Sequence, residues 1–294
     1  MNILLTGGNG FIGKNFIEKY GSKYNIFAPS SHEVDLMQIR QVSDYFKDKH
    51  FDVVIHAAGK SDGYYGSEKQ ADNLVMFKNV QYESILHGVK KLLVIGDAAD
   101  FDRSRPLDGV PETEFGKSIP QDAYGLGRYL ITMLASKDKI STVLRFFTVY
   151  GKYCDVASSK TMELTARGVT GKKNAVIERD RTFGAVYVDD AVKIIAAFAD
   201  NDFEKGEYNI ASDTPLSLSF VAKTAKRLAK KDGREINVSI LDETEDNIYT
   251  GSVEKLMSVM PKLRFTSHAT ALKQVYEHLK KHKSQAKPKE AGKQ

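Results

Sequence analysis

The chain has 294 residues, of which 41% are hydrophobic and 28% charged, and it contains one cysteine, Cys154. This composition is that of a globular protein with one large domain or two closely joined domains, and it excludes collagen-like, disordered and disulfide-stabilised classes. The net charge of +5 lies in residues 280–294, which hold six lysines and one glutamate and are expected to form a disordered basic tail. Residues 1–279 are therefore neutral, which gives no support to nucleic-acid binding.

No apolar stretch approaches the roughly 20 residues that cross a bilayer, and no basic segment precedes the short apolar run at the start of the chain. We therefore predict a cytoplasmic protein without a membrane partner. The single cysteine agrees with a reducing compartment. Among the seven histidines, only 278 and 282 lie four residues apart, in a lysine-rich terminal segment, so no metal site is predicted.

Short apolar runs and helix-period segments alternate through the first 150 residues. Strands are predicted at residues 2–5, 24–28, 53–56, 92–95 and 142–146. Helices are predicted between them, at residues 11–20, 37–49, 72–87 and 124–137. Continuous apolar strands separated by helices indicate a parallel sheet covered on both faces, which is a doubly wound, Rossmann-like α/β domain. Its ligand site is expected at the carboxyl ends of the strands.

The alternation weakens after residue 151. Helices are predicted at residues 161–171, 186–199, 216–231 and 269–282, and strands at 174–177 and 207–211. We expect residues 1–150 to form a dinucleotide-binding domain whose sheet is completed by elements around residues 184–212. Residues 151–183 and 213–279 are expected to form a smaller α+β lobe that binds the substrate.

A glycine-rich turn follows the first predicted strand and opens the first predicted helix, with the sequence Thr-Gly-Gly-Asn-Gly-Phe-Ile-Gly at residues 6–13. The first glycine of the motif permits a tight turn, the second lets the backbone approach a diphosphate, and the third allows the helix to pack closely on the sheet. Free amides and the positive end of the helix dipole attract the phosphates. This context predicts that a dinucleotide is bound by Gly7, Asn9, Gly10, Phe11, Ile12 and Gly13.

Seven further motifs, in the right order, resemble those of the extended short-chain dehydrogenase/reductase superfamily, in the branch of nucleotide-sugar epimerases, dehydratases and ketoreductases. They are Asp35-Leu36, His56-Ala57-Ala58-Gly59, Asn73, Pro111-Glu112-Thr113-Glu114, Arg-Phe-Phe-Thr-Val-Tyr-Gly at 145–151, Val-Tyr-Val-Asp-Asp at 186–190 and Tyr-Asn-Ile at 208–210.

The resemblance covers nearly the whole chain before the tail, and it assigns roles to several of these residues. It implies that Asp35 and Leu36 contact the adenine, and that Ala57, Ala58 and Gly59 run beside the cofactor after the family's fourth strand. It also implies a homodimer formed through the helices at 72–87 and 124–137.

The end of the second predicted strand bears on the choice of nicotinamide cofactor. Ser30 and Ser31 are placed to donate hydrogen bonds to a ribose 2′-phosphate, and Lys14 could supply a cation, which favours NADP(H). Glu33 is the first carboxylate after this strand. If its side chain reaches back to the strand end, it would bind the ribose 2′-hydroxyl, repel a 2′-phosphate and favour NAD(H) instead.

The resemblance implies a catalytic Tyr-x-x-x-Lys pair on one helix face, in which the lysine holds the nicotinamide ribose and the tyrosine exchanges a proton during hydride transfer. This chain has Tyr124 and Arg128 at these positions. A Ser or Thr after the family's fifth strand should bind the substrate oxygen, but residues 94–101 contain neither. Asp97 is nearest by spacing, and a shift of one residue would give Ala98. A deprotonated aspartate accepts hydrogen bonds and cannot donate one.

Three residues are predicted on the substrate side by the same resemblance. Arg181, or nearby Arg179, resembles the arginine that clamps a nucleotide diphosphate, although this segment could equally be a solvated charge cluster. Thr148 replaces the asparagine of the family's Arg-x-x-Asn-x-Tyr-Gly run. Tyr64 lies in a loop that the family often uses near the sugar.

Two functions are compatible with these features. The first is an NAD(P)-dependent oxidoreductase or epimerase acting on a nucleotide-activated sugar, by 4-keto reduction or C4 epimerisation. Tyr124 would be the general acid/base, Arg128 would hold the ribose and tune Tyr124, and Asp97 would contact the substrate. The second is a catalytically impaired protein of the same fold that binds a cofactor or a sugar nucleotide, as a regulator or as one subunit of an assembly.

Overall fold

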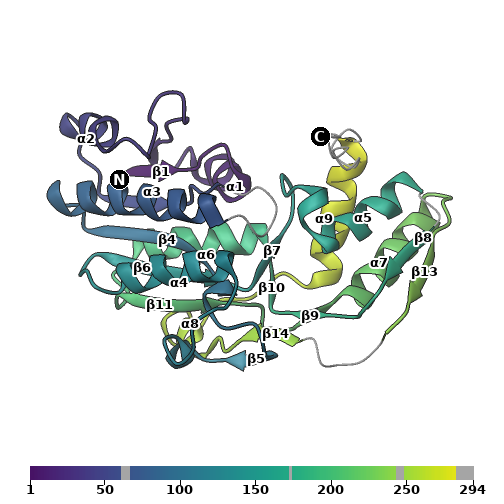
Figure 1. The fold of residues 1–294 in the computed structure, drawn as a ribbon. Helices are drawn as coiled ribbons and strands as arrows, with labels where there is room; N and C mark the ends of the chain where they lie inside the picture. The colour runs from purple at the N-terminus through teal and green to yellow at the C-terminus, as the bar shows by residue number, and fades with distance from the viewer. Residues whose placement is uncertain (61–66, 172–173, 243–247, 283–294) are drawn as a thin grey trace.

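The computed structural model describes residues 1–60, 67–171, 174–242 and 248–282. The chain forms a larger lobe around a parallel sheet and a smaller lobe that contains helices α5 (Lys160–Thr170), α7 (Leu218–Lys231) and α9 (His268–Lys281) (Figure 1). Strands β7 (Thr148–Tyr150), β9 (Thr182–Phe183) and β10 (Ala185–Tyr187) lie between the two lobes in this view.

The central sheet has six strands in the order β11-β6-β4-β3-β1-β2, and all its pairs are parallel. The strands are β1 (Asn2–Thr6), β2 (Asn25–Phe27), β3 (Val53–His56), β4 (Lys91–Asp97), β6 (Ser141–Phe146) and β11 (Gly206–Ile210). Strand β1 pairs with β2 on one side and with β3 on the other. The chain therefore adds β2 on one side of β1 and the later strands β3, β4, β6 and β11 on the other. A doubly wound sheet places its ligand crevice at such a switch point, beyond the carboxyl ends of the strands.

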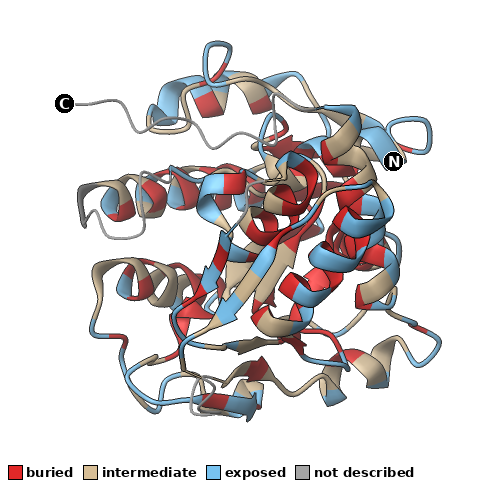
Figure 2. Cartoon of the chain, turned by 90° about the vertical axis from the view of Figure 1, so that its right-hand side faces the viewer, coloured by how far each residue is buried: buried red, intermediate tan, exposed pale blue. Residues whose placement is uncertain are grey.

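Both faces of this sheet are buried, as the unbroken apolar strands predict. Ile3, Leu5 and Ile55 belong to a core on one face, whereas Leu4 and Val54 belong to a second core on the other. Helices α1 (Phe11–Tyr20) and α6 (Val188–Asp200) cover the first face, and α2 (Ile39–Lys47), α3 (Ser67–Leu86) and α4 (Ala123–Ala135) cover the second. Buried residues line the inner sides of the helices and exposed residues their outer sides (Figure 2).

The predicted elements of the first half are confirmed in type and differ by a few residues at their ends. In the second half, two predicted helices begin too early. Residues 185–187 form strand β10 (Ala185–Tyr187), which pairs with β7 (Thr148–Tyr150), and residues 216–217 form β12 (Leu216–Ser217). Helices α6 and α7 (Leu218–Lys231) therefore start at residues 188 and 218.

The segments that the resemblance places after the family's fourth and fifth strands follow the third and fourth strands of the central sheet here. The segment 56–59 follows the third strand of the central sheet and Asp97 ends the fourth. From β2 the chain passes through residues 28–38 directly into α2, so β2 is the edge of the sheet and no strand lies beyond it among the described residues.

A four-stranded sheet connects the lobes, in the order β12-β9-β14-β5. Strand β5 (Leu107–Val110) pairs in parallel with β14 (Ile248–Gly251), and β14 pairs with β9 (Thr182–Phe183). The sequence did not predict β5, β14 or the short helix α8 (Glu254–Val259). These strands are two to four residues long, and β5 and β14 lie some 140 residues apart in the chain, so no local pattern marks their pairing.

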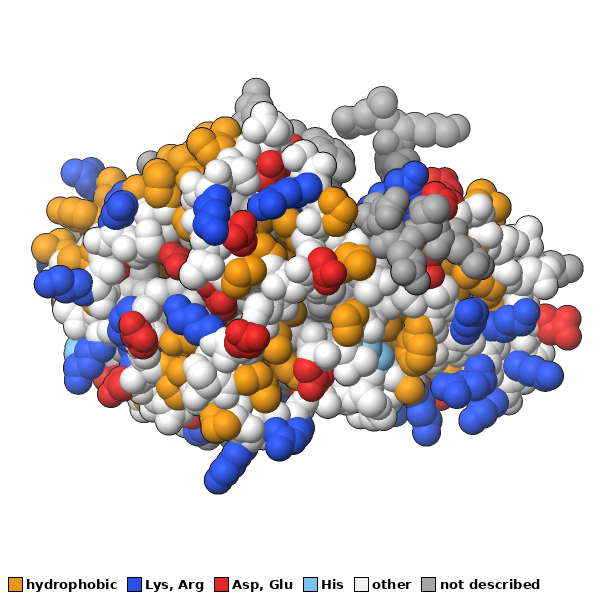
Figure 3. All heavy atoms as spheres, turned by 90° about the horizontal axis from the view of Figure 1, so that it is seen from below, with side chains coloured by type: hydrophobic (Ala, Val, Ile, Leu, Met, Phe, Trp, Pro, Cys, Tyr) orange, Lys and Arg blue, Asp and Glu red, His pale blue; other side chains and the backbone are white. Residues whose placement is uncertain are grey.

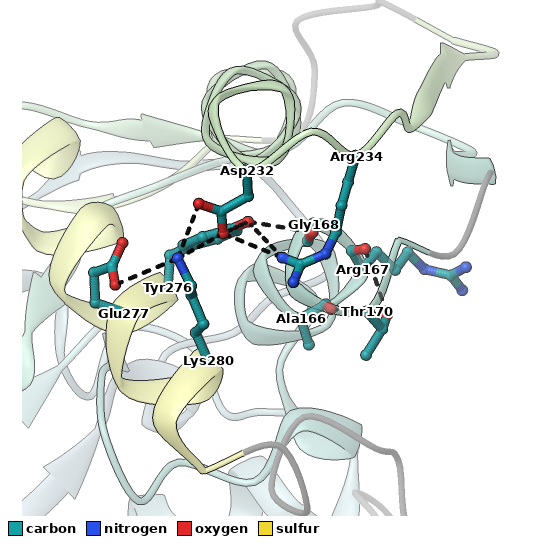
Figure 4. Close-up of polar contacts among 9 residues, drawn as sticks. All are labelled: Ala166, Arg167, Gly168, Thr170, Asp232, Arg234, Tyr276, Glu277 and Lys280. Carbon is teal, nitrogen blue, oxygen red and sulfur yellow. Dashed lines mark hydrogen bonds and ion pairs between the residues drawn. The ribbon is translucent and has the colours of Figure 1, made fainter.

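The smaller lobe packs helices α5 (Lys160–Thr170), α7 and α9 (His268–Lys281) beside the two-stranded sheet of β8 (Asn174–Ile177) and β13 (Asn237–Ile240). Asp232, at the end of α7, accepts hydrogen bonds from Tyr276 Oη (3.1 Å) and Lys280 Nζ (2.9 Å) of α9 and from Arg234 Nη1 (3.2 Å). The Tyr276 hydroxyl also lies 3.5 Å from the Gly168 carbonyl of α5. Asp232 therefore joins the end of α7 to α9, and the Tyr276 hydroxyl links both to α5 (Figure 4).

Positive charge also gathers on the smaller lobe, outside residues 280–294. Lys and Arg side chains cluster over this lobe when the molecule is seen from below (Figure 3). Helix α7 contributes five exposed cations, namely Lys223, Lys226, Arg227, Lys230 and Lys231. None of the helices in the described ranges is long and apolar enough to span a membrane.

Candidate active site

The glycine turn has the backbone geometry that the sequence motif requires. Gly7 has φ +76°, and a Cβ at this position would lie 2.7 Å from the backbone of Ala57. A Cβ at Gly13 would lie 2.3 Å from the Gly7 carbonyl oxygen. Gly10 caps α1 without a side-chain hydrogen bond, and the first turn of α1 holds no acidic residue. The start of α1 therefore offers unblocked amides and a positive dipole end, which fit a diphosphate.

The wall beside this turn is held by buried polar contacts. Thr6 Oγ1 and His56 Nδ1 lie 2.9 Å apart, and burial, with a nearby arginine, lowers the pKa of His56 to about 4. Asn73 Oδ1 accepts the backbone N–H of Lys60 at 2.7 Å, and Asn73 Nδ2 donates to the Lys60 carbonyl at 3.1 Å. These bonds fix the segment that contains Ala57, Ala58 and Gly59 against the glycine turn.

A carboxylate lies in the segment that follows β2. Glu33 Oε2 accepts hydrogen bonds from the backbone N–H (2.7 Å) and the Oγ (2.8 Å) of Ser30, and these bonds lower the pKa of Glu33. Glu33 therefore reaches back to Ser30, which is the arrangement that the alternative with NAD(H) requires, and the Ser30 hydroxyl is already bonded to an anion. Ser31 is exposed, whereas Asp35 and Leu36 are half-buried close by in the sequence.

The structure brings together the three residues predicted to be catalytic. Tyr124, in the first turn of α4, donates a hydrogen bond from Oη to Oδ2 of Asp97 at the end of β4, at 2.8 Å. Arg128 lies one turn further along α4, with its Cζ 5.1 Å from the centre of the Tyr124 ring. Its Nη2 lies 3.6 Å from the position that a Cβ of Gly59 would occupy. The pair therefore faces the wall of the glycine turn.

Asp97 rather than Ala98 faces the tyrosine. Ala98 is fully buried in an apolar cluster, whereas Asp97 is half-buried and contacts the Tyr124 hydroxyl. Asp97 Oδ1 also accepts the backbone N–H of Ala99 at 2.8 Å, so the carboxylate is held by both oxygens. The spacing argument left both residues open, and of the two it is Asp97 whose side chain contacts Tyr124.

The electrostatics of this group keep Tyr124 protonated. Burial raises the pKa of Tyr124 most, the negative charge of Asp97 raises it further, and the positive charge of Arg128 lowers it in part. The Nε of Arg128 is buried and has no hydrogen-bonding partner within the described ranges. A buried donor without a partner costs free energy, about 1–3 kcal/mol, unless a ligand satisfies it. The residues present therefore fit a bound ligand with a polar acceptor between Arg128 and Gly59.

Two residues that the sequence reasoning missed position the start of α4. Asp122 is the N-cap of α4 and accepts the Gly125 N–H at 2.9 Å. Arg103 donates from Nη2 to Asp122 at 2.8 Å, and its Cζ lies 6.0 Å from the centre of the Tyr124 ring. An aspartate just before a predicted helix is a capping signal that could have identified Asp122, but no local pattern marks Arg103.

A buried ion pair supports the segment after Asp97. The Nε of Arg145 lies 2.8 Å from both oxygens of Asp100, and Thr132 of α4 donates to Asp100 at 2.8 Å. Both side chains of the ion pair are fully buried. Burial raises the pKa of Asp100 to about 6, and the adjacent guanidinium opposes this shift. The network joins β6, α4 and the turn after β4, so it fixes the backbone that presents Asp97.

Among the described residues, those predicted on the substrate side, Thr148 and Arg181, are not brought together by contacts. Thr148 is half-buried, and its Oγ1 donates to the carbonyl of Phe147 at 2.5 Å. Arg181 is exposed between β8 and β9. Arg179 pairs with Asp242 at 3.0 Å in a solvated ion pair, which agrees with the charge-cluster interpretation for this residue. Tyr64 lies outside the described residues.

Comparison with known proteins decides the family. The model of the NAD dependent epimerase/dehydratase family matches residues 3–211, which is more than two thirds of the chain. The chain belongs to this family. The Rossmann-like sheet, the glycine turn and Tyr124 all lie within the matched region.

Relatives of this epimerase/dehydratase family member act on nucleotide sugars according to their names. GDP-L-colitose synthase from Yersinia pseudotuberculosis is 31% identical over 109 residues, which is 35% of each chain. The match therefore spans about a third of that relative. UDP-glucose 4-epimerase from Vibrio cholerae is 22% identical over 72% of this chain and 70% of the epimerase.

Solved structures show the same fold. A GDP-L-fucose synthetase from Naegleria fowleri superposes with a TM-score of 0.83 at 18% identity, over 96% of this chain and 94% of that one. The same synthetase bound to NADP gives a TM-score of 0.82 at 17% identity, over the same shares of the two chains.

Proposed function

We propose that this protein is an NAD(P)-dependent oxidoreductase or epimerase that acts on a nucleotide-activated sugar, by reduction of a 4-keto group or epimerisation at C4. One observation carries the proposal: the Tyr124 hydroxyl lies 2.8 Å from Asp97, beside Arg128 and the wall of the glycine turn. The family membership and the nucleotide-sugar relatives support the substrate class.

The cofactor site is proposed along the carboxyl ends of β1, β2 and β3. Gly7, Gly10 and Gly13, with the amides of Asn9, Phe11 and Ile12, would hold the diphosphate. Asp35 and Leu36 would contact the adenine, and Arg128 would bond a ribose hydroxyl with its unpartnered Nε. A bound nicotinamide supplies hydride transfer to or from the sugar carbon.

The residues around Tyr124 favour proton donation. A phenol whose pKa is raised by burial and by Asp97 stays protonated at neutral pH, so it can give a proton to an oxygen that gains negative charge. Accepting a proton from a sugar hydroxyl would require the tyrosinate, which Asp97 disfavours. Reduction of a keto sugar is therefore the direction that this site supports best.

The carboxylate in the segment that follows β2 favours NAD(H) over NADP(H). Glu33 is held there by two hydrogen bonds from Ser30, and a 2′-phosphate beside it would meet like charge. We therefore propose NAD(H) as the preferred cofactor, in place of the sequence-based preference for NADP(H).

A homodimer through α3 and α4 is supported by the apolar side chains that these adjacent helices expose. Tyr82 and Leu86 of α3 are 57% and 61% exposed, and Leu126 of α4 is 40% exposed. Large apolar residues on neighbouring helices are typical of an interface. On the substrate side, Thr148, Arg181 and Tyr64 remain proposed contacts of the sugar nucleotide.

The second candidate function is a catalytically impaired binding protein of the same fold. The observation that favours it is the replacement of both catalytic partners of the tyrosine. Asp97 accepts from Tyr124 where the family has a hydroxyl donor, and Arg128 cannot relay protons as a lysine can. Cofactor binding would survive these changes, because the glycine turn is intact.

A panel of nucleotide sugars tests the two functions. The active enzyme should transfer hydride to or from bound NAD(P) with one member of the panel, and Tyr124→Phe should lower that rate by at least about 10²-fold. Tyr45→Phe, in α2, is the matched control and should retain the rate. Unchanged turnover of Tyr124→Phe would refute the assigned role. An inactive parent that gains activity as the double variant Arg128→Lys/Asp97→Ser would establish the impaired protein.

A further inference from the structure

At the end of β4 and in the turn that follows it, neither Asp97 nor Ala98 offers a neutral hydrogen-bond donor to a sugar. Asp97 occupies the place of the expected hydroxyl and accepts the Tyr124 proton, and Ala98 has no polar group. A carboxylate facing a keto oxygen or a sugar hydroxyl can only accept. A donor that takes the place of the expected hydroxyl would therefore come from another element.

Tyr249 comes from β14, which approaches this region from the sheet that connects the two lobes. Its ring centre lies 5.4 Å from that of Phe147, next to Thr148. The same ring packs against the apolar cluster that contains Ala98 and Phe101, the neighbours of Asp97 in the turn after β4. Strand β14 pairs with β5, which continues the chain from that turn. Tyr249 therefore packs beside the turn that follows Asp97, on an element other than α4.

The charged groups of the site affect the pKa of the Tyr249 phenol. Asp97, Arg103 and Tyr124 each act on it, in addition to burial, which is the largest cause of its raised pKa. The phenol is therefore protonated at neutral pH. In the ranges that the structure describes, its hydroxyl has no hydrogen-bonding partner, and it is not among the fully enclosed unpaired polar atoms. The protonated Tyr249 hydroxyl is therefore available to donate a hydrogen bond to a ligand.

We propose that Tyr249 is a substrate-binding residue that donates a hydrogen bond to an oxygen of the sugar, in place of the hydroxyl that Asp97 and Ala98 cannot supply. The inference rests on the proposed function, because it requires a sugar nucleotide in this site. Tyr124 and Tyr249 would then contact the sugar from two different elements, α4 and β14. The residue would distinguish the sugar and make no contribution to binding of the nucleotide.

The test compares ligands with and without a sugar. Calorimetry would measure the affinity of wild type, Tyr249→Phe and the control Tyr45→Phe for GDP-L-fucose, UDP-glucose, GDP and UDP, with NAD present. Loss of one hydrogen bond should weaken binding of the preferred nucleotide sugar roughly three- to tenfold in Tyr249→Phe and leave the matching nucleotide unchanged. Thermal unfolding of each variant checks that the fold is retained.

The outcomes separate this inference from the proposed function. If wild type binds neither nucleotide sugar more tightly than its nucleotide, both ideas fail. If wild type prefers a nucleotide sugar and Tyr249→Phe keeps that preference, the inference is wrong and the proposed function stands. Equal weakening of sugar nucleotide and nucleotide in Tyr249→Phe would show a structural role and would also overturn the inference.

Discussion

Replacing Asp97 by asparagine should lower the pKa of Tyr124. In the wild type, the Tyr124 hydroxyl donates to an anionic oxygen at 2.8 Å, in a buried setting, and the charge of Asp97 disfavours a second negative charge on the phenol. Asparagine keeps the shape and can keep the bond to the Ala99 N–H through its oxygen, while its NH₂ group replaces Oδ2. The hydrogen bond to Tyr124 then reverses and stabilises the tyrosinate.

The size of this effect follows from the hydrogen bond. A bond to a charged partner contributes about 1.5–3 kcal/mol, against about 0.5–1.5 kcal/mol for a neutral one. The difference of roughly 1–1.5 kcal/mol corresponds to about one pKa unit, since one unit is 1.36 kcal/mol. Reversal of the bond makes this a lower bound, so we expect the pKa of Tyr124 to fall by at least about one unit.

The assay is a difference titration of tyrosinate absorbance, in which the curve of a Tyr124→Phe variant is subtracted from that of its parent. It is run in the wild-type and Asp97→Asn backgrounds, so it requires no turnover and works for an impaired enzyme. Asp102→Asn, in the same turn region, is the control and should not move the Tyr124 curve. An unchanged Tyr124 titration in Asp97→Asn would refute the electrostatic account of the site.

Three further predictions address the cofactor and the fold. Glu33→Gln should raise the affinity for NADP relative to NAD, because a carboxylate that would repel a 2′-phosphate is removed; fluorescence titration with both dinucleotides measures the ratio, and an unchanged ratio contradicts the assignment. Asp100→Asn should destabilise the fold by about 3–5 kcal/mol in urea unfolding, because it leaves Arg145 buried without its counter-charge, and a loss below 1 kcal/mol would show that the pair is not important for stability. The pKa of His56 is about 4 in the folded protein and 6.5 ordinarily, so the unfolded chain binds a proton more readily. The free energy of unfolding should therefore fall by up to roughly 3 kcal/mol between about pH 6.5 and pH 4. His56→Gln should weaken this acid sensitivity, whereas His32→Gln, at an exposed position, should leave it unchanged.

The fold of the first half could be predicted because its signals are local. Successive residues of the central strands are apolar, so both faces of each strand are buried. This pattern identifies the strands and predicts helices on both faces of the sheet. The glycine turn was predicted for the same reason, since Gly7, Gly10 and Gly13 lie within seven residues of one another.

The features that the sequence did not predict depend on contacts between distant segments. The sequence around Leu107–Val110 has no pattern typical of a strand. This segment forms β5 by pairing with β14, which lies some 140 residues further along the chain. The position of the Glu33 carboxylate depends on a turn of the backbone that returns the side chain to Ser30. Arg103 bonds Asp122 beside the Tyr124 ring, and spacing in the sequence cannot show such a bond.

The pairing of β5 with β14 limits how this protein can be divided. Gly109 donates its backbone N–H to Thr250 Oγ1 at 2.8 Å, and Ser252 donates to the Val110 carbonyl at 2.9 Å. A fragment that ends near residue 150 would lose these partners and expose an unpaired edge next to the turn that carries Asp97. The first half of the chain is therefore unsuitable as a module for transplantation or split-protein reassembly, and a viable cut has to keep the two strands on one fragment.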